Sequence, residues 1–123
     1  MIDDEDAIVR YQSRLLERLG FQVSGFTSPA AALAAFRAEP SAFDALLTDL
    51  NLPGISGLDI LAEVLRLRPG FPVILLSGLV TEELAAAAIG RGAGAVIMKP
   101  GSSEELVSTL HRLLEPSPAI DQL

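Results

Sequence analysis

The sequence has 123 residues, half of them hydrophobic, which is enough apolar material for the core of one folded domain. Its 16 acidic residues outnumber nine scattered basic residues, which argues against binding to nucleic acid. With no cysteine and no apolar run near the roughly 18 residues of a membrane span, we expect a cytoplasmic protein without disulfides, thiolate zinc sites or membrane contact.

Short apolar runs alternate with helical periods along the chain. At the start, only Met1 and Ile2 precede the acidic residues, although a strand normally has about five residues. We therefore expect the native chain to have more strand in front of Met1. The other runs have the composition of buried parallel strands, and they are FQVSGF (21–26), LLTDL (46–50), PVILLSG (72–78) and AVIM (95–98).

Large apolar residues recur at helical spacing between these runs, so we expect each helix to bury one apolar stripe. The stripes are Ile8, Tyr11, Leu15 and Leu19; Leu58, Leu61 and Leu65; and Leu106, Leu110, Leu113 and Leu114. The helix around 84–89 has few large apolar anchors and should pack loosely. Expected helix caps are Ser28 before Pro29, Thr81 before two glutamates, and Ser102 with Glu105.

Five strands alternating with five helices predict an α/β domain over residues 1–115, with a doubly wound parallel sheet and helices on both faces. Residues 116–123 contain two prolines and are expected to form a C-terminal tail or linker. Ligands of such sheets bind beyond the carboxyl ends of the strands.

Polar residues follow four of the predicted strands: Asp3 and Asp4, Asp49, Ser77 and Lys99. Three carboxylates brought together repel one another unless a cation neutralises them. Mg²⁺ suits this set because it needs only one or two carboxylates besides water and phosphoryl oxygens. The ammonium group of Lys99 and the hydroxyl group of Ser77 complement a phosphoryl group.

Four segments in this order and at these separations carry a family resemblance, namely IDDE (2–5), TDLNLPGISG (48–57), LLSG (75–78) and MKP (98–100). Over residues 1 to about 115 the chain resembles the receiver domain of bacterial two-component response regulators. The resemblance implies a flavodoxin-like (βα)5 fold whose five-stranded parallel sheet has the strand order 2-1-3-4-5.

The resemblance also implies the chemistry of the site. Asp49 would accept a phosphoryl group from a phosphohistidine and would bind Mg²⁺ together with Asp4. The backbone carbonyl of Asn51 would be a further ligand, and Asp3 would act through a water molecule.

Ser77 would be the switch hydroxyl, Lys99 would neutralise the phosphoryl group, and the bond before Pro100 would be cis. Many receivers have an aromatic switch residue where this chain has Val96, so output here is expected to use another surface or to relay the phosphoryl group. The other departures from the commonest pattern are Ser56, Gly78 and Gly101.

Expected partners are a histidine kinase or a histidine phosphotransfer protein. The glycine after Ser77, the ISG after the Asp49 loop and the non-aromatic residue after Lys99-Pro100 together look similar to receivers at the ends of hybrid sensor histidine kinases. The face of the fourth helix, fifth strand and fifth helix is a candidate homodimer surface.

Two other functions are compatible with the residues. One is a receiver-like interaction module that works without phosphorylation. The other is a haloacid-dehalogenase-like phosphatase, although that class has a second aspartate where this chain has Asn51.

Overall fold

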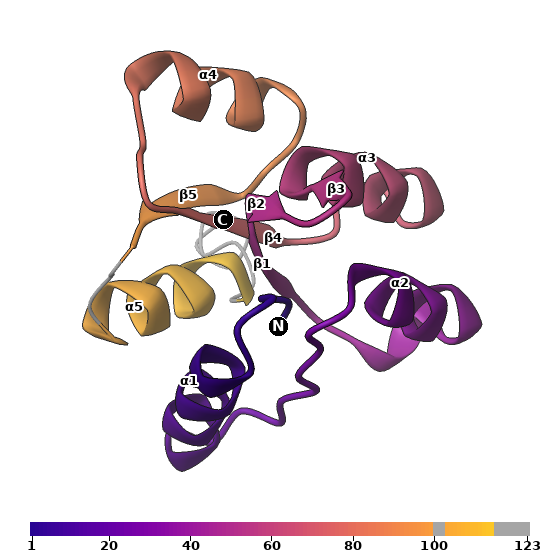
Figure 1. Ribbon diagram of the computed structural model, residues 1–123, viewed down its shortest axis with the longest axis vertical. Coiled ribbons are helices and arrows are strands. Elements are labelled where there is room, and N and C mark those ends of the chain that lie inside the picture. The colour runs from indigo at the N-terminus through magenta and orange to yellow at the C-terminus, as the bar shows by residue number, and fades with distance from the viewer. Residues whose placement is uncertain (100–102, 115–123) are drawn as a thin grey trace, which may run out of the picture.

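A computed structural model describes residues 1–99 and 103–114 of the chain, and Figure 1 shows how their helices surround a central sheet. No helix in these two ranges is long and apolar enough to cross a membrane. The elements in chain order are α1 (Asp6–Arg18), α2 (Pro29–Ala38), the 3-10 helix η1 (Pro40–Ala42), β1 (Leu46–Asp49), β2 (Asn51–Leu52), β3 (Ile55–Ser56), α3 (Gly57–Leu67), β4 (Val73–Ser77), α4 (Glu82–Gly90), β5 (Ala95–Met98) and α5 (Ser103–Leu114).

The main sheet has β4 at its centre, paired in parallel with β1 on one side and with β5 on the other. In the register, Asp49 lies opposite Leu76, and Ser77 lies opposite Met98. Every residue of β4 is buried, as expected for a continuous apolar run covered on both faces. The strands predicted at 46–50, 72–78 and 95–98 are thus confirmed.

The first two predicted strands are reduced to single β-bridges. Ile2 pairs in parallel with Phe26 on one side and with Thr48 on the other, so the strand order 2-1-3-4-5 is confirmed. The prediction of a strand over 21–26 is wrong, because residues 1–3 offer pairing partners only to the end of this segment, at 24–26.

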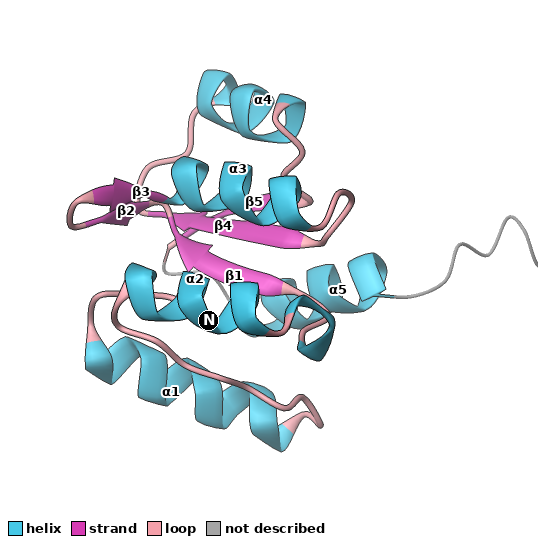
Figure 2. Ribbon diagram, turned by 90° about the vertical axis from the view of Figure 1, so that its right-hand side faces the viewer, coloured by secondary structure: helices cyan, strands magenta, loops and turns pink. Residues whose placement is uncertain are grey.

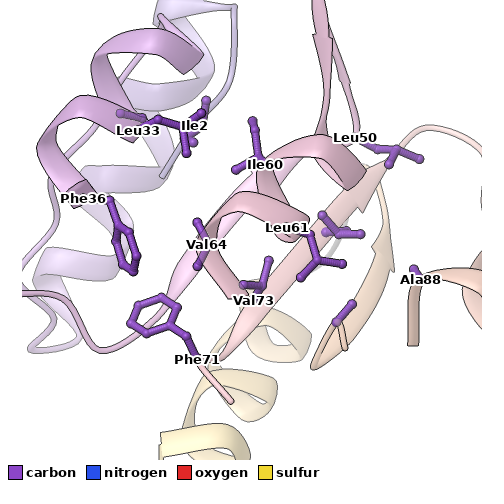
Figure 3. Packing of buried hydrophobic residues seen from close by; sticks show 13 residues of the cluster. Ile2, Leu33, Phe36, Leu50, Ile60, Leu61, Val64, Phe71, Val73 and Ala88 are labelled. Atoms are coloured by element: carbon purple, nitrogen blue, oxygen red, sulfur yellow. The ribbon is translucent and has the colours of Figure 1, made fainter. Parts of the chain in front are cut away.

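The core consists of two apolar clusters, one on each face of the sheet. One cluster joins α2, α3 and α4 to the strands and includes Leu33, Ile60 and Ala88; the other joins α1 and α5 to them. Figure 2 shows α3 and α4 above the strands and α1 and α5 below. In the first cluster Phe36 and Phe71 meet edge to face, with their ring centroids 5.0 Å apart (Figure 3). The sheet is therefore a buried central layer, as predicted for a doubly wound fold.

The predicted stripe of α1 is partly wrong. The helix buries Val9 and Leu16, whereas the Tyr11 side chain is 70% exposed and Leu19 is 51% exposed. The buried face is rotated by about one residue from the predicted one, which a short helix with apolar residues at both positions permits. The other two stripes follow the prediction more closely, since Leu61, Leu106 and Leu110 are all buried.

Hydroxyl caps begin three of the helices. Ser28 accepts a hydrogen bond from the Ala31 N–H, and Thr81 accepts one from the Leu84 N–H, so both predicted caps are confirmed. The predicted cap at Ser102 lies outside the described residues. A capping box that was not predicted begins α3, where Ser56 and Asp59 bond each other's backbone N–H groups.

Candidate phosphoryl site

Three carboxylates meet at the carboxyl end of β1. Asp3, Asp4 and Asp49 can each offer an oxygen atom so that all three atoms lie within 4.8 Å of one another. Asp3 is fully buried and Asp49 is 8% exposed, whereas Asp4 is exposed to solvent. The chain reaches this arrangement because Ile2 pairs beside Thr48, which aligns the two strand ends. The predicted carboxylate cluster is therefore present.

Lys99 supplies the counter-charge at this edge. Its Nζ donates to Asp3 Oδ2 at 2.7 Å and to Asp49 Oδ2 at 3.1 Å. Partial burial by itself lowers the pKa of Lys99, but the hydrogen bonds to Asp3 and Asp49 and the charges of both carboxylates together outweigh burial and raise it. Lys99 consequently stays protonated at neutral pH.

Backbone donors hold the remaining oxygen atoms of the two buried carboxylates. The Glu5 N–H donates to Asp3 Oδ1 at 3.0 Å, and the Asn51 N–H makes a longer contact of 3.4 Å with Asp49 Oδ1. Asn51 itself is exposed and opens the two-stranded β2–β3 hairpin. These bonds fix the orientation of both carboxylates before any ligand arrives.

Gly57 is a site-supporting residue to which the sequence assigned no role. A Cβ atom added there would lie 2.7 Å from the Asp49 carbonyl oxygen and 2.9 Å from the Leu50 Cα atom. Its N–H also donates to the Leu50 carbonyl at 2.7 Å. Because only glycine leaves room for this approach, α3 can begin directly against the end of β1. The sequence did contain a signal for this role of Gly57, namely a small residue at the first position of the helix that follows the β1 loop.

Ser77 ends β4 at the same edge and is almost fully buried. Its backbone carbonyl accepts a hydrogen bond from the Lys99 N–H at 2.7 Å, which ties the ends of β4 and β5 together. Its hydroxyl group, however, donates to the Leu79 carbonyl at 3.0 Å and accepts from the Leu79 N–H at 3.3 Å. The hydroxyl is thus engaged by the loop that follows β4.

Two further predicted positions have different outcomes. Val96 lies half-buried in β5 and packs against the α2–α3–α4 cluster, as an apolar residue would. Pro100 and its peptide bond lie outside the described residues, as does Gly101.

The donor set fits a hard divalent cation. Three carboxylates and one ammonium group leave two negative charges uncompensated, which equals the charge of one such ion. All available side-chain ligands are oxygen atoms, which Mg²⁺ and Ca²⁺ prefer, and exposed Asp4 leaves the cluster open to solvent.

A comparison with protein families identifies the fold and the general function. The family model described as "Response regulator receiver domain" matches residues 1–111. The chain belongs to the response regulator receiver family. It is therefore a module of two-component signalling, and receivers of this family are generally phosphorylated by histidine kinases.

Curated relatives of the receiver are regulators longer than this chain. The C4-dicarboxylate transport transcriptional regulatory protein DctD of Rhizobium meliloti is 34% identical over 94% of this chain and 25% of its own length. Sensory transduction protein RegX3 of Mycobacterium tuberculosis is 32% identical over 93% of this chain and 49% of its own length. The receiver thus spans between a quarter and half of these relatives.

Solved structures have the same architecture. A response regulator receiver domain protein from Clostridium thermocellum is similar with a TM-score of 0.87 and 31% identity, over 92% of this chain and 90% of that one. A response regulator protein from Burkholderia pseudomallei, with a phosphorylated aspartic acid, a calcium ion and citrate, has a TM-score of 0.79 and 28% identity over 98% of this chain and 68% of that one. The flavodoxin-like receiver fold is thereby established for this chain.

Proposed function

We propose that this receiver accepts a phosphoryl group from a phosphohistidine onto Asp49 and signals by rearranging the loop after β4. The observation that carries the proposal is the contact of the Asp49 carboxylate with the Lys99 ammonium group inside a carboxylate cluster at a strand end. The similar Burkholderia pseudomallei protein, which carries a phosphorylated aspartic acid beside a calcium ion, supports the same chemistry for this chain.

In the transfer, an oxygen atom of Asp49 attacks the phosphorus atom and forms a P–O bond. The P–N bond to the partner's imidazole breaks, and the imidazole keeps its electron pair. Lys99, 3.1 Å from Asp49, neutralises a phosphoryl oxygen as charge builds up there. Positioning and charge stabilisation supply most of the catalysis in such a transfer.

Mg²⁺ is the proposed cofactor. The carboxylates of Asp4 and Asp49 and the backbone carbonyl of Asn51 would hold it, with Asp3 acting through a water molecule. When bound, the ion supplies positive charge that stabilises the phosphoryl oxygens. Asp3 remains bonded to Lys99, so the lysine and the acidic cluster are held together in the absence of a ligand.

The switch step would exchange one hydrogen bond for another. In the unphosphorylated receiver Ser77 Oγ donates to the Leu79 carbonyl. A phosphoryl group on Asp49 offers a stronger acceptor at the same edge, so the Ser77 hydroxyl would turn toward it and release Leu79. The Leu79 side chain is 70% exposed, so little packing opposes a movement of this loop.

The proposed donor is a histidine kinase or a histidine phosphotransfer protein. The face formed by α4, β5 and α5 is the proposed surface for pairing with a second copy of the chain. Ile89 on α4 and Met98 on β5, which belong to two of these elements, are each 50% exposed and offer apolar surface for such a contact. A second copy would cover both.

The test is phosphorylation by acetyl phosphate with Mg²⁺, followed by measurement of the intact mass. We expect the wild-type chain to gain one phosphoryl group and Asp49→Asn to gain none. Asp44→Asn is the matched control, because Asp44 is an exposed carboxylate at the opposite end of β1. It should react like the wild type. Chelation of Mg²⁺ with EDTA should abolish the reaction.

Two outcomes would contradict the proposal. If the wild type gains no mass, or if Asp49→Asn gains as much as the wild type, Asp49 is not the acceptor. Loss of the reaction in Asp44→Asn as well would point to general damage rather than to a site. Steady release of phosphate from a generic phosphate ester would instead favour a phosphatase.

A further inference from the structure

Thr48 is a buried polar residue that the proposed mechanism does not use. It lies in β1 directly before Asp49, and its side chain is fully buried. Its neighbours across the sheet are apolar, since it lies opposite Leu75 of β4 and is bridged to Ile2 on the other side. A hydroxyl group in apolar surroundings costs free energy unless it makes a hydrogen bond. The partner of this hydroxyl group therefore decides what the residue contributes.

The Thr48 hydroxyl group donates to the backbone carbonyl of Asp49. The distance from Thr48 Oγ1 to the Asp49 oxygen is 3.0 Å, and the bond is buried. Leu46 and Leu50, each two residues away, pack in the apolar cluster of α2, α3 and α4, so Thr48 points to that face of the sheet as well. Gly57 at the start of α3 lies against the same carbonyl. The Asp49 carbonyl is thus covered by α3.

The Asp49 carbonyl lies where the pairing of β1 with residues 1–3 ends. The Asp49 N–H donates to the Ile2 carbonyl at 2.9 Å, which is the last backbone bond between these two segments in the described part of the chain. The next N–H, that of Asp3, donates to the Phe26 carbonyl at 3.2 Å and so turns away from β1. A buried carbonyl without a donor costs free energy. The Thr48 hydroxyl group therefore replaces a backbone donor that the sheet does not supply.

The hydrogen bond from Thr48 completes the restraints on the backbone around Asp49. The peptide group before the Asp49 Cα atom is held by the bond to the Ile2 carbonyl. The peptide group after it is held at both ends. Its N–H, which belongs to Leu50, donates to the Leu76 carbonyl at 2.8 Å, and its carbonyl accepts from Thr48. Without the hydroxyl group, this second peptide group would lose one of its two restraints.

The carboxylate of Asp49 depends on these backbone restraints because its own hydrogen bonds are long. Its oxygen atoms lie 3.1 Å from Lys99 Nζ and 3.4 Å from the Asn51 nitrogen. In a transfer that works by positioning, a misplacement of about 1 Å can cost on the order of 100-fold in rate. The orientation of the peptide group after Asp49 should therefore affect the rate at which the carboxylate reacts.

We propose that Thr48 is a positioning residue for phosphoryl transfer. Its buried hydroxyl group fixes the peptide group after Asp49 and thereby the direction from which the Asp49 carboxylate meets the phosphorus atom. The inference rests on the proposed function, because it requires Asp49 to be the acceptor. Since Thr48 is fully buried, it acts through Asp49 and not on the donor.

The test compares Thr48→Val with Thr48→Ser. Valine keeps the branched shape but lacks the hydroxyl group, whereas serine keeps the hydroxyl group but lacks a methyl group. We expect Thr48→Val to react with acetyl phosphate roughly tenfold more slowly than the wild type, and Thr48→Ser to react within about twofold of the wild-type rate. Thr48→Ser should still lower the melting temperature, because it leaves a small cavity. A slow reaction caused by lost stability alone would thus appear in Thr48→Ser as well.

Two further measurements separate positioning from a purely structural role. Acetyl phosphate and phosphoramidate should be slowed by the same factor in Thr48→Val, because Thr48 acts on the acceptor. The NMR resonance of the Asp49 carbonyl carbon should shift in Thr48→Val and stay near its wild-type position in Thr48→Ser, since only the first variant loses the hydrogen bond.

Thr109→Val is the matched control, because it also removes a threonine hydroxyl group that donates to a backbone carbonyl. In α5, Thr109 Oγ1 donates to the Glu105 carbonyl at 2.8 Å. This variant should react like the wild type. If it is slowed as much as Thr48→Val, the effect is a general one of lost hydroxyl groups, and the inference is wrong.

The remaining outcomes distinguish the inference from the proposed function. Equal rates for the wild type, Thr48→Val and Thr48→Ser would overturn the inference and leave Asp49 as the acceptor. Equal slowing of both variants, or slowing with one donor alone, would also overturn it. If the wild type gains no phosphoryl group, or if Asp49→Asn gains as much as the wild type, the proposed function fails and the inference fails with it.

Discussion

At the scale of single residues, Lys99 holds the candidate site together. It bridges the fully buried Asp3 and the nearly buried Asp49. Removing one partner of a buried ion pair costs more than the pair contributes, because the remaining charge loses its compensation. We expect Lys99→Ala to lower the free energy of unfolding by about 1–3 kcal/mol in urea denaturation.

The control for Lys99→Ala is Arg91→Ala, which removes an exposed cation at the end of α4. It should leave the free energy of unfolding nearly unchanged. Added Mg²⁺ should restore part of the stability of Lys99→Ala, because the three carboxylates remain. An unchanged stability of Lys99→Ala would mean that Asp3 and Asp49 are solvated well enough without it.

Glycine substitutions at two positions near the site should differ sharply. A Cβ atom at Gly57 would collide with backbone atoms of Asp49 and Leu50, whereas one at Gly78 would meet nothing within 4 Å. We expect Gly57→Ala to cost about 1–3 kcal/mol and to slow phosphorylation of Asp49. Gly78→Ala should be neutral or slightly stabilising. Thermal unfolding and acetyl phosphate reactivity of both variants provide the measurement, and equal behaviour would refute the steric explanation.

At the scale of elements, α4 should be the least stably packed helix beside the switch loop. Ala88 is its only buried residue, whereas α3 buries Ile60, Leu61 and Val64 completely or nearly so. Local opening is easier where few apolar contacts are lost. We expect backbone amides in the last turns of α4 to exchange with deuterium faster than those of α3. Comparable protection of the two helices would contradict this view of α4.

The strands of the main sheet could be predicted because β1, β4 and β5 are covered on both faces and so read as continuous apolar runs. The β2–β3 hairpin could not, since strands of two residues leave no periodic signal. The face of α1 was misjudged because Tyr11 combines an apolar ring with a hydroxyl group that tolerates solvent. The hydrophobic pattern of the sequence therefore predicted the type of each longer element, whereas the face that a helix buries depended on how it packs.

Part of the candidate site could likewise be predicted from the sequence, and part could not. Asp3, Asp49, Ser77 and Lys99 could be brought together from sequence, because parallel strands end at one edge. The bond between the Ser77 hydroxyl and the Leu79 carbonyl could not, since it depends on the path of a loop. The close approach of Gly57 to β1 could not be predicted either, because it also depends on the path of a loop.

At the scale of the whole molecule, residues 1–3 link the two ends of the sheet. Asp3 belongs to the carboxylate cluster, and the amino group of Met1 donates to the Ser24 carbonyl at 3.2 Å on the side toward the amino end of the sheet. Ile2 between them has a 1% exposed side chain and pairs with both neighbours. A change that holds Met1 in place should therefore also hold Asp3 and Asp4 in position. It should thereby strengthen the binding of a cation at the carboxyl end of the sheet.

The buried amino group of Met1 should make the stability of the whole chain depend on pH. Burial lowers the pKa of this group from 8.0 to about 6. Between these values the unfolded chain binds more protons than the folded one, so the free energy of unfolding rises with pH. We expect it to fall by about 2 kcal/mol as the pH is lowered from 8 to 6, with a small further loss from this group below pH 6 as the folded chain also becomes protonated.

Urea denaturation across this pH range provides the measurement. Histidine side chains also ionise near neutral pH, so the series belongs in a His111→Gln background, which removes the only histidine of the chain. A flat profile would show that the amino group is hydrated despite its hydrogen bond to the Ser24 carbonyl.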